Sequence, residues 1–281
     1  MTWNLWWRFG PWRERQPAIA AELARADPDL ALLQEVWCHP EDGDQADLLA
    51  APRGYHVARS TKGLPGGVAK EPYRFGNAIL SRWPVRSGET VVLPGVDEER
   101  SHRTAVVAEI DHPDGAFLAV SAHLEWRYDQ SATRQRQLDA LLQHLRMRRD
   151  ALGSARPIIF GGDLNAVPHS DEVRRLTGLA PPYGGANHAH EGSGPVFTDC
   201  WAAVCDDPGY TWTRDNPYAQ DALWPRRRID YVLVSWPRPK PTDNPLAASL
   251  AGQLVFEGVV ASDHYAVVVE LDDRPPQETD E

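Results

Sequence analysis

The stretch that most constrains the fold lies at residues 156–165, where a short apolar run is followed by two glycines and a polar pair (RPIIFGGDLN). The run Ile158 to Phe160 predicts a short buried strand, and the glycines predict a sharp turn in a tight space. Asp163 and Asn165 are two residues apart, so in an extended segment their side chains lean to the same side. Such a pair suits hydrolysis, because aspartate can accept a proton from water while asparagine fixes the water or an anionic oxygen. The pair equally suits an Asx turn that closes the strand, and this stretch alone leaves both interpretations open.

Other strand-like runs carry a polar residue where an apolar one would be expected. Residues 30–37 (LALLQEVW) reach Glu35 after an apolar run that predicts a strand buried on both faces. A buried carboxylate costs several kcal/mol unless a cation or donors meet it, so Glu35 needs a partner, either a metal or a neighbouring arginine. His123 ends a similar run, where a histidine is more often part of the core, and Asn4 interrupts an aromatic strand at residues 2–7.

Two acidic residues near the C-terminus have a histidine within reach. Asp230 stands near the start of a strand at residues 229–234, after three arginines, where it could form a salt bridge or hold a histidine. Asp263 and His264 are adjacent just before the apolar run 265–269. In a loop before a strand, neighbouring side chains can point toward one place, whereas neighbours within a strand diverge.

The remaining pattern predicts many short strands and few helices. The turn at residues 111–115 (DHPDG) favours a hairpin. Residues 61–73 are expected to form a surface loop at the rim of the site, and residues 181–195, with His188 and His190, a surface loop in preference to a metal site. Strands are expected at 55–59, 75–81, 91–93, 103–110, 117–124 and 209–213, and helices at 14–25, 130–150, 170–176 and 198–203.

Composition limits the possible classes of protein. A chain of 281 residues without a long linker predicts one domain at 1–273, followed by a disordered tail at 274–281.

The net charge of -11 argues against a broad basic face for nucleic acid, although a divalent cation can mask the repulsion locally. Cys38, Cys200 and Cys205 are too few and too scattered for a disulfide framework or a zinc site. Without a signal pattern or an apolar run of about 18 residues, we expect a soluble, cytoplasmic monomer with no membrane insertion.

Taken in their order along the chain, the polar motifs resemble those of the endonuclease/exonuclease/phosphatase superfamily, the Mg²⁺-dependent phosphoesterases related to DNase I. The resemblance runs from Thr2 to Leu271 and implies an α/β fold, a four-layer α/β/β/α sandwich of two mixed β-sheets flanked by helices. The motifs that carry it are Asn4, Leu-Gln-Glu at 33–35, Ser-x-His-Leu at 121–124, Gly-Asp-x-Asn at 162–165, Arg-Ile-Asp-Tyr at 228–231 and Ser-Asp-His at 262–264.

The resemblance also implies a role for each residue. Glu35, helped by Asp263, would hold Mg²⁺, for which Mn²⁺ could substitute. Asp163 would activate the attacking water. Asn4 and Asn165 would donate to phosphate oxygens, and Asp230 and His264 would form an Asp-His pair. His123 would face the phosphate or the leaving oxygen.

The substrate is the least defined part of the prediction. We expect a phosphodiester in nucleic acid or a nucleotide-like compound; the alternatives are a small or lipid-derived phosphate and, from another class, a non-catalytic binding protein. Residues 123–125 (HLE) and 210–213 (YTWT) are similar to stretches of the tyrosyl-DNA phosphodiesterases within the superfamily. Trp37 and Trp126 could line the substrate pocket as a stacking wall, although core packing is the commoner role for a single tryptophan. Arg103 is a candidate phosphate clamp.

Overall fold

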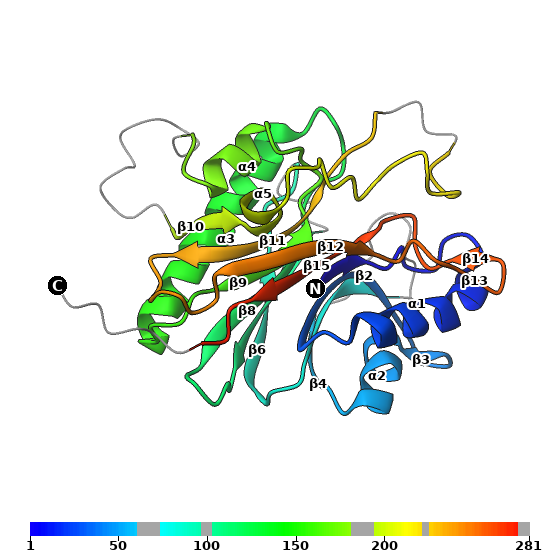
Figure 1. Cartoon of the computed structure of the whole chain (residues 1–281), viewed down its shortest axis with the longest axis horizontal. Coiled ribbons are helices and arrows are strands. Elements are labelled where there is room, and N and C mark those ends of the chain that lie inside the picture. Colours follow the sequence, from blue (N-terminus) through cyan, green and yellow to red (C-terminus); the bar gives the residue numbers. More distant parts are fainter. Residues whose placement is uncertain (61–73, 97–102, 181–193, 221–224, 275–281) are drawn as a thin grey trace.

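Two β-sheets lie face to face in the computed structural model, which describes residues 1–60, 74–96, 103–180, 194–220 and 225–274. Helices cover the outer faces of the sheets (Figure 1), so the layers run helix, sheet, sheet, helix. The predicted four-layer sandwich of mixed sheets is therefore confirmed. Among the described residues, no helix is long and apolar enough to span a membrane.

The first sheet contains both the first and the last of the described strands. Its parallel pair β1–β2 lies between antiparallel neighbours on both sides, and β1 pairs with the last strand, β15. In spatial order its strands are β12 (Pro245–Ala251), β15 (Ala266–Leu271), β1 (Thr2–Asn4), β2 (Leu30–His39), β5 (Arg74–Ser81) and β4 (His56–Arg59), with β3 (Gly43–Asp44) paired to β2.

The second sheet has β9 near its centre, parallel to β8 and antiparallel to β11. β7 and β8 form the hairpin predicted around residues 111–115. In order its strands are β10 (Val196–Asp199), β11 (Asp230–Trp236), β9 (Ile159–Asp163), β8 (Phe117–His123), β7 (Thr104–Ile110) and β6 (Val85–Val92); a separate ribbon joins β13 (Val255–Phe256) and β14 (Val259–Val260).

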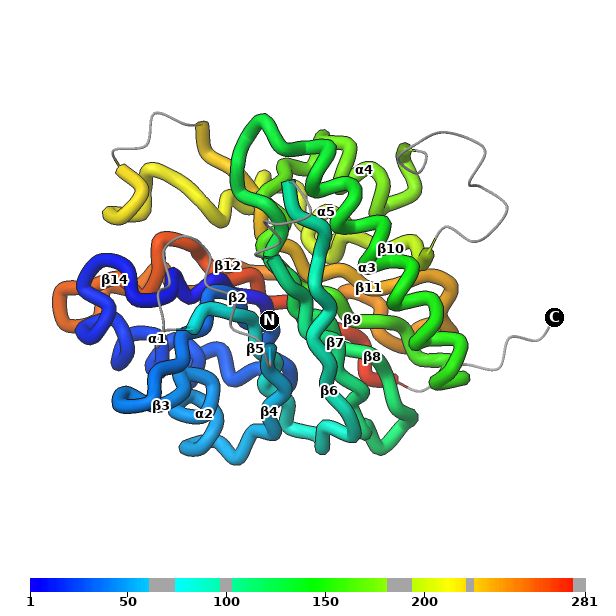
Figure 2. Tube along the Cα trace, turned by 180° about the vertical axis from the view of Figure 1, so that it is seen from behind, coloured from blue at the N-terminus to red at the C-terminus, as the bar shows by residue number. Residues whose placement is uncertain are grey.

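Helices α1 (Trp12–Ala26) and α2 (Gln45–Ala50) pack on the first sheet, and α3 (Ser131–Leu152) and α4 (Asp171–Leu176) on the second; Figure 2 shows the same arrangement from behind. A short 3₁₀ turn (Ala51–Arg53) follows α2, and α5 (Cys200–Val204) closes the edge between β11 and β12. These helices cover both sheets, so the central parallel pairs β1–β2 and β8–β9 are buried on both faces.

The hydrophobic core has three layers because alternate residues of each strand face opposite sides. Leu32, Ile79 and Phe117 pack between the sheets. Beyond the second sheet, one face of α3 packs against the strands through four buried leucines, Leu138, Leu141, Leu142 and Leu145. Each such leucine contributes about 1.5–3 kcal/mol through burial.

Several predicted boundaries were wrong. The first strand ends at Asn4, because Trp6 and Trp7 take positive φ values of 56° and 33° and turn the chain. Residues 209–213 form only an isolated bridge between Trp212 and Arg227. The four predicted helices are present within a few residues, whereas α2, β10 and β12 were not predicted. The loops at 61–73 and 181–193, with His188 and His190, and the tail beyond 274 lie outside the described residues, and the single domain at 1–273 stays a prediction.

Candidate active site

The strand ends bring the candidate polar residues to one end of the sandwich. Asp163, the last residue of β9, is paired in register with His123 of β8 on one side and with Asp230 of β11 on the other. Asn4 ends β1 in the facing sheet, and its Nδ2 donates to Asp163 Oδ2 at 3.0 Å. Residues from three other strands, β1, β8 and β11, therefore surround the carboxylate of Asp163.

Asp163 is buried and surrounded by donors. Its Oδ2 lies 3.4 Å from His123 Nε2 and 3.8 Å from His264 Nε2. Its Oδ1 accepts a hydrogen bond from the backbone N–H of Asn165 at 2.9 Å, so the predicted Asx turn also forms. Burial raises the pKa of Asp163 to about 6, with Asp230 acting in the same direction and His264 against it. A carboxylate with such a pKa is a competent base at neutral pH.

His264 and Asp230 form a buried pair. His264 Nδ1 lies 2.9 Å from Asp230 Oδ2, and Asp230 is fully buried. Burial opposes the charge of His264, but the carboxylates of Asp230, Asp263 and Asp163 outweigh it and hold the pKa of His264 well above its usual range. His264 is therefore an imidazolium at neutral pH, with Nε2 directed toward Asp163.

Glu35 lies in an irregular part of β2. The register against β5 shifts between Leu33 and Val36, and Glu35 has φ 54°, in the left-handed region that costs a non-glycine residue about 1–3 kcal/mol. The bulge turns Glu35 toward the site, where its Oε1 lies 3.8 Å from His123 Nδ1. Among the described residues, Glu35 Oε2 is buried without a hydrogen-bond partner. Burial raises the pKa of Glu35, chiefly against the opposing effect of Arg103.

Asp263 adds a further carboxylate beside His264. Burial raises its pKa to about 7, His264 lowers it, and Glu35 raises it further. Among the described residues, neither Glu35 nor Asp263 forms a salt bridge with an arginine, although Glu35 is close enough to raise the pKa of Asp263. Buried carboxylate oxygens such as those of Glu35 and Asp263 fit a hard divalent cation, because such a cation prefers one or two carboxylates together with substrate oxygens.

A second acidic group also has the spacing of a metal site. The ligand atoms of Asp163, Asp230 and His264 lie within 4.8 Å of one another. His264 Nδ1 and Asp230 Oδ2 are already hydrogen-bonded to each other, and a protonated imidazole cannot ligate a metal. The unpartnered Oε2 of Glu35 therefore marks the better place for a cation.

His123 is backed by Arg103. Nη1 of Arg103 lies 2.9 Å from His123 Nε2, and Phe75 lies beside the imidazole with ring centroids 6.1 Å apart. Burial, followed by the charge of Arg103, holds the pKa of His123 well below its usual range. His123 is therefore neutral beside a cation, whereas His264 is charged. Arg103, predicted as a phosphate clamp, stands against His123, and its contact with a phosphate stays a prediction.

The other predicted residues occupy different surroundings. Asn165 Nδ2 donates to the carbonyl oxygen of Leu124 at 3.2 Å, which joins the turn after β9 to the end of β8. Trp37 is 2% exposed and packs edge-on against Trp12, as part of an aromatic cluster. Trp126 is 53% exposed, with the guanidinium of Arg127 placed 5.3 Å from its ring centroid. Of the two tryptophans, only Trp126 has a ring surface open to a ligand; substrate contact by either stays a prediction.

Sequence reasoning missed three residues that support the site. Ser262 Oγ donates to the carbonyl oxygen of Asn4 at 2.7 Å and accepts from the backbone N–H of His264, which ties the last loop to the first strand. Thr211 Oγ1 accepts from the backbone N–H of Asp230 at 3.3 Å. Arg15 of α1 is fully buried and donates to four backbone carbonyls in the turn after β1 and to that of Ala261, just before the Ser-Asp-His motif. Ser262 belongs to the Ser-Asp-His motif and could have been recognised, whereas nothing in a helical pattern distinguishes Arg15 from a surface arginine.

Comparison with known proteins gives one family. A model of the Endonuclease/Exonuclease/phosphatase family matches residues 1–264. Tyrosyl-DNA phosphodiesterase 2 of Xenopus laevis is 25% identical over 265 residues, which cover 92% of this chain and 62% of that protein, so the chain spans about three fifths of the relative's length.

Two solved structures have the same fold. The endonuclease/exonuclease/phosphatase from Beutenbergia cavernae superposes with a TM-score of 0.68 at 25% identity, covering 95% of this chain and 69% of that chain. TDP2 from D. rerio, solved in complex with a single strand DNA product, superposes with a TM-score of 0.70 at 20% identity and covers 95% and 96% of the two chains.

Proposed function

The chain belongs to the Endonuclease/Exonuclease/phosphatase family, and on that premise we propose that it is a divalent-metal-dependent phosphoesterase that hydrolyses a phosphodiester bond in nucleic acid or a nucleotide-like substrate. The observation that carries the proposal is the position of the Asp163 carboxylate close to the imidazoles of His123 and His264. A carboxylate with a raised pKa lies beside a charged histidine, His264, and a neutral one, His123. Groups pushed to opposite protonation states in one site are typical of acid–base catalysis.

Asp163 is the proposed base. Hydrolysis requires a water molecule to lose a proton as it attacks phosphorus, and a carboxylate with a pKa of about 6 is ionised at neutral pH yet basic enough to accept that proton. The amide of Asn4 holds Oδ2 and the backbone N–H of Asn165 holds Oδ1, so the carboxylate cannot rotate freely. A fixed base keeps the attacking water in line.

The cationic and neutral donors would stabilise the charge that grows on phosphate. His264, protonated and anchored by Asp230, supplies an N–H in a buried site, where a charged hydrogen bond is stronger than in water. Asn4, Asn165 and His123 add neutral donors at the same end of the sheets. Together these residues would favour the transition state over the bound substrate, because negative charge shifts to the oxygens only as the bond breaks.

Glu35 and Asp263 are the proposed metal ligands. Among the described residues, Glu35 Oε2 is buried without a hydrogen-bond partner, and burial raises the pKa of Asp263 even though the charge of His264 opposes it, so a cation would stabilise both carboxylates further. Mg²⁺ or Mn²⁺, when bound there, would act as a Lewis acid on the phosphoryl oxygens. The ion would also offset the negative charge of this protein toward an anionic substrate.

Nucleic acid is favoured among the phosphodiesters by the names of the relatives. The Xenopus protein is a tyrosyl-DNA phosphodiesterase, and the D. rerio structure contains a DNA product. The exposed ring of Trp126 near the end of β8 supports this choice, since bases stack on such rings. DNA carrying a 5′-tyrosyl group therefore belongs among the first substrates to test.

The test is a substrate panel assayed with Mg²⁺, with Mn²⁺ and with EDTA. It contains bis-p-nitrophenyl phosphate, single-stranded DNA, 5′-tyrosyl DNA, RNA, inositol phosphates and sphingomyelin, and His264→Ala protein measures any contaminating activity. We expect diester and nucleic-acid hydrolysis with metal, and less than about 1% of it in EDTA. Hydrolysis of lipid or inositol compounds alone would replace the proposal with the alternative substrate class, and hydrolysis unaffected by EDTA would contradict the metal requirement.

A further inference from the structure

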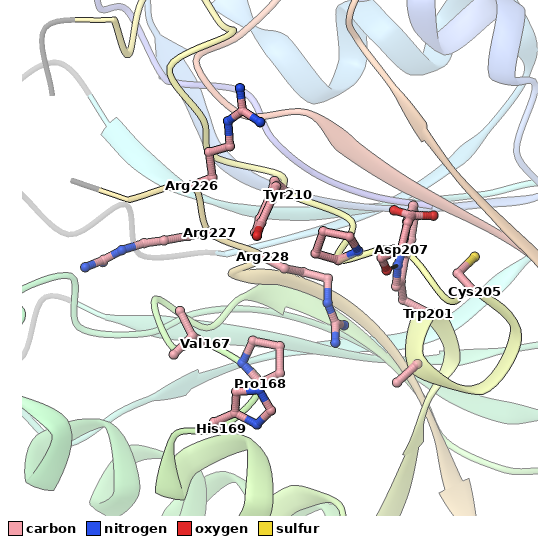
Figure 3. Close-up of a pocket in the computed structure, with 12 residues that line it drawn as sticks. Val167, Pro168, His169, Trp201, Cys205, Asp207, Tyr210, Arg226, Arg227 and Arg228 are labelled. Carbon is pink, nitrogen blue, oxygen red and sulfur yellow. Dashed lines mark hydrogen bonds between the residues drawn. The ribbon is translucent and has the colours of Figure 1, made fainter. Parts of the chain in front are cut away.

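Arg15, near the start of α1, is fully buried and forms no salt bridge with a carboxylate among the described residues. Other buried arginines do have such a partner. Arg134 pairs with Glu172, and Arg228, drawn in Figure 3 in the wall of a pocket of about 390 Å³, pairs with Asp199. Burying a charge is unfavourable unless hydrogen bonds or an opposite charge compensate it. The groups around Arg15 must therefore compensate its charge in another way.

Backbone carbonyls from two separate segments surround the guanidinium of Arg15. Four of them belong to the turn at residues 5–9, which follows β1, and accept from Nη1 and Nη2 at 2.9–3.1 Å. The fifth is the carbonyl of Ala261, which accepts from Nη1 at 2.8 Å. A guanidinium can hold two segments at once because its donors form a rigid, planar fork. We call these five hydrogen bonds the Arg15 clamp.

The turn at residues 5–9 is bonded to two residues of the active site. The backbone N–H of Trp6 donates to Asn4 Oδ1 at 2.9 Å, which orients the amide so that its Nδ2 donates to the proposed base. The backbone N–H of Trp7 donates to the carbonyl oxygen of Glu35 at 3.1 Å. Trp6, Trp7 and Glu35 all have positive φ values, and such a backbone persists only where its surroundings determine it. The clamp therefore acts on Asn4 and on Glu35 through this turn.

The other segment of the clamp leads to Asp263. The carbonyl of Ala261, which accepts from Arg15, lies two residues before Asp263. The next carbonyl, that of Ser262, accepts from Nδ2 of buried Asn216 at 2.7 Å. Both carbonyls before Asp263 are thus held by buried side chains. One proposed metal ligand is bonded to the turn at residues 5–9 and the other follows Ala261, so a single guanidinium connects the two.

Arg15 keeps its charge close to both proposed metal ligands. Burial lowers the pKa of Arg15 to about 10, and the charges of Asp263, Tyr218 and Glu35 oppose that shift. The guanidinium is therefore charged at neutral pH. A positive charge in this position would by itself weaken the binding of a metal cation, because like charges repel. Any favourable effect of Arg15 on metal binding must therefore come from the geometry that it imposes.

We propose that Arg15 is a positioning residue that fixes Glu35 and Asp263 relative to each other for Mg²⁺ and fixes Asn4 for the reaction. The inference rests on the proposed function and assigns to it a residue that touches neither substrate nor metal. Mg²⁺ demands near-ideal octahedral geometry, whereas Ca²⁺ accepts longer and more variable distances to oxygen. Loosening the clamp should therefore reduce the affinity for Mg²⁺ more than the affinity for Ca²⁺.

The test compares Arg15→Lys with wild type by calorimetric titration of Mg²⁺ and of Ca²⁺. Lysine keeps the charge but has three donors and no planar fork, so it cannot hold both segments. We expect the Kd for Mg²⁺ to rise about ten-fold and the Kd for Ca²⁺ to rise less than about three-fold. At saturating Mg²⁺, kcat on bis-p-nitrophenyl phosphate should fall by about ten-fold or more. Arg175→Lys, at a buried arginine of α4 that pairs with Asp139, should leave the metal affinities and kcat unchanged.

Hydrogen exchange in EDTA measures the clamp without metal or substrate. In Arg15→Lys, the backbone amides of residues 5–9 and those of residues 262–265 should exchange about ten-fold faster, whereas those of residues 138–145 in α3 should keep their wild-type rates. Arg15→Met loses the charge as well as the donors. If the geometry outweighs the repulsion between Arg15 and the metal, this variant should also bind Mg²⁺ more weakly than wild type.

The outcomes separate this inference from the proposed function. Unchanged Mg²⁺ affinity in Arg15→Lys, equal losses of affinity for Mg²⁺ and Ca²⁺, or the same losses in Arg175→Lys would each overturn the proposal. Tighter Mg²⁺ binding by Arg15→Met would show that the residue acts through its charge, which would overturn the proposal as well. A wild type that binds neither ion and hydrolyses no diester would reject the proposed function. Faster exchange in both segments would then still support the clamp, and unchanged exchange in either segment would overturn it.

Discussion

At the scale of single residues, burial acts against every charge in the site, and the neighbours decide which charges persist. Burial raises the pKa of Glu35, Asp163 and Asp263 and lowers that of His123. His264 alone among these five keeps its charge firmly, because carboxylates on several sides outweigh its burial. The site thus concentrates negative groups that lack a full set of partners, an arrangement that favours a bound cation.

Replacing Asp230 with Asn tests the state of His264. The variant keeps the shape of the side chain and removes the charge that stabilises the imidazolium, so the pKa of His264 should fall. Because the protonated form is the donor, the alkaline limb of the pH–kcat profile should move to lower pH by about one unit or more, and kcat on that limb should drop by about ten-fold for each unit of the shift. Asp150→Asn, on the exposed end of α3, should leave the profile unchanged. A profile identical to wild type in Asp230→Asn would exclude the proposed role of His264.

Replacing Glu35 with Gln separates metal binding from folding. The amide removes a buried charge that no donor satisfies at Oε2, so the metal-free protein should become more stable by about 1 kcal/mol, which raises Tm by about 2–4 °C. Calorimetric affinity for Mg²⁺ should fall by about ten-fold or more, since one of few anionic ligands is lost. Glu270→Gln, on an exposed part of β15, serves as the control. A lower Tm combined with unchanged metal affinity would argue against Glu35 as a ligand.

At the scale of elements, the glycines that close β9 set the distance between its neighbours. A Cβ on Gly162 would lie 2.3 Å from the backbone oxygen of Ala122 in β8, and one on Gly161 would lie 2.5 Å from a side-chain methyl of Leu32 in the facing sheet. The first contact involves backbone and cannot relax cheaply, whereas a leucine methyl can rotate away. Glycine at 162 therefore keeps β8 and β9 close enough for His123 and Asp163 to meet.

The two glycine-to-alanine variants should differ in stability and activity. Gly162→Ala should lower the free energy of unfolding by about 3 kcal/mol, and Gly161→Ala by about 1 kcal/mol, in urea titrations. Gly162→Ala should also reduce kcat by about 100-fold, because it displaces His123 against Asp163 in the next register pair. Equal losses in both variants would show that inter-strand distance at β8–β9 does not position the site.

The sequence predicted elements better than it predicted the local irregularities that aim the side chains. The leucine stripe of α3 and the apolar runs of β2, β8 and β9 are periodic, and the structure contains them where the patterns indicated. The bulge at Glu35 left no such trace, because it arises from the pairing of β2 with β5. The turn at Trp6 and Trp7 is predicted as a continuing strand because aromatic residues favour strands, whereas in the structure long-range contacts, among them the hydrogen bonds from buried Arg15 to their carbonyls, hold the turned conformation.

At the scale of the whole molecule, the stability of the metal-free protein should depend on pH through the site. Asp163 and Asp263 have pKa values raised from 3.8 to about 6 and about 7, so the folded state binds their protons more tightly than the unfolded state does. Stability is then highest while both are protonated and falls as pH rises through this window. The carboxylates around His264 raise its pKa well above its usual value although burial opposes its charge. The folded protein therefore keeps this proton above about pH 6.5, where the unfolded chain loses it, and His264 adds to the fall in stability as the pH rises toward 8.

Thermal unfolding in EDTA between pH 5 and pH 8 measures this effect. We expect the free energy of unfolding to fall by about 3 kcal/mol over the range, with a matching decrease in Tm. Asp263→Asn should flatten the curve, and saturating Mg²⁺ should raise Tm most at pH 8, where the carboxylates are ionised. A Tm that rises steadily from pH 5 to pH 8 without metal would contradict the electrostatic description of the site.

The gathering of the polar residues could be anticipated only through the resemblance of the ordered motifs to a family. Asn4 and His264 are separated by most of the chain, and periodicity contains no information on which strand ends meet. The structure brings Asn4, Asp163 and His264 together because β1 pairs with β15 and faces β9 across the sandwich.

The most direct measurement is the steady-state hydrolysis of bis-p-nitrophenyl phosphate with Mg²⁺ at pH 7.5 by wild type and by Asp163→Asn, whose fold is verified by circular dichroism. Asp171→Asn, on the exposed start of α4, controls for a change of charge. If residues from separate strands converge on Asp163 to activate water, kcat of Asp163→Asn should be lower by about 1,000-fold or more while Asp171→Asn remains active. A folded Asp163→Asn protein with kcat within about ten-fold of wild type would contradict that account.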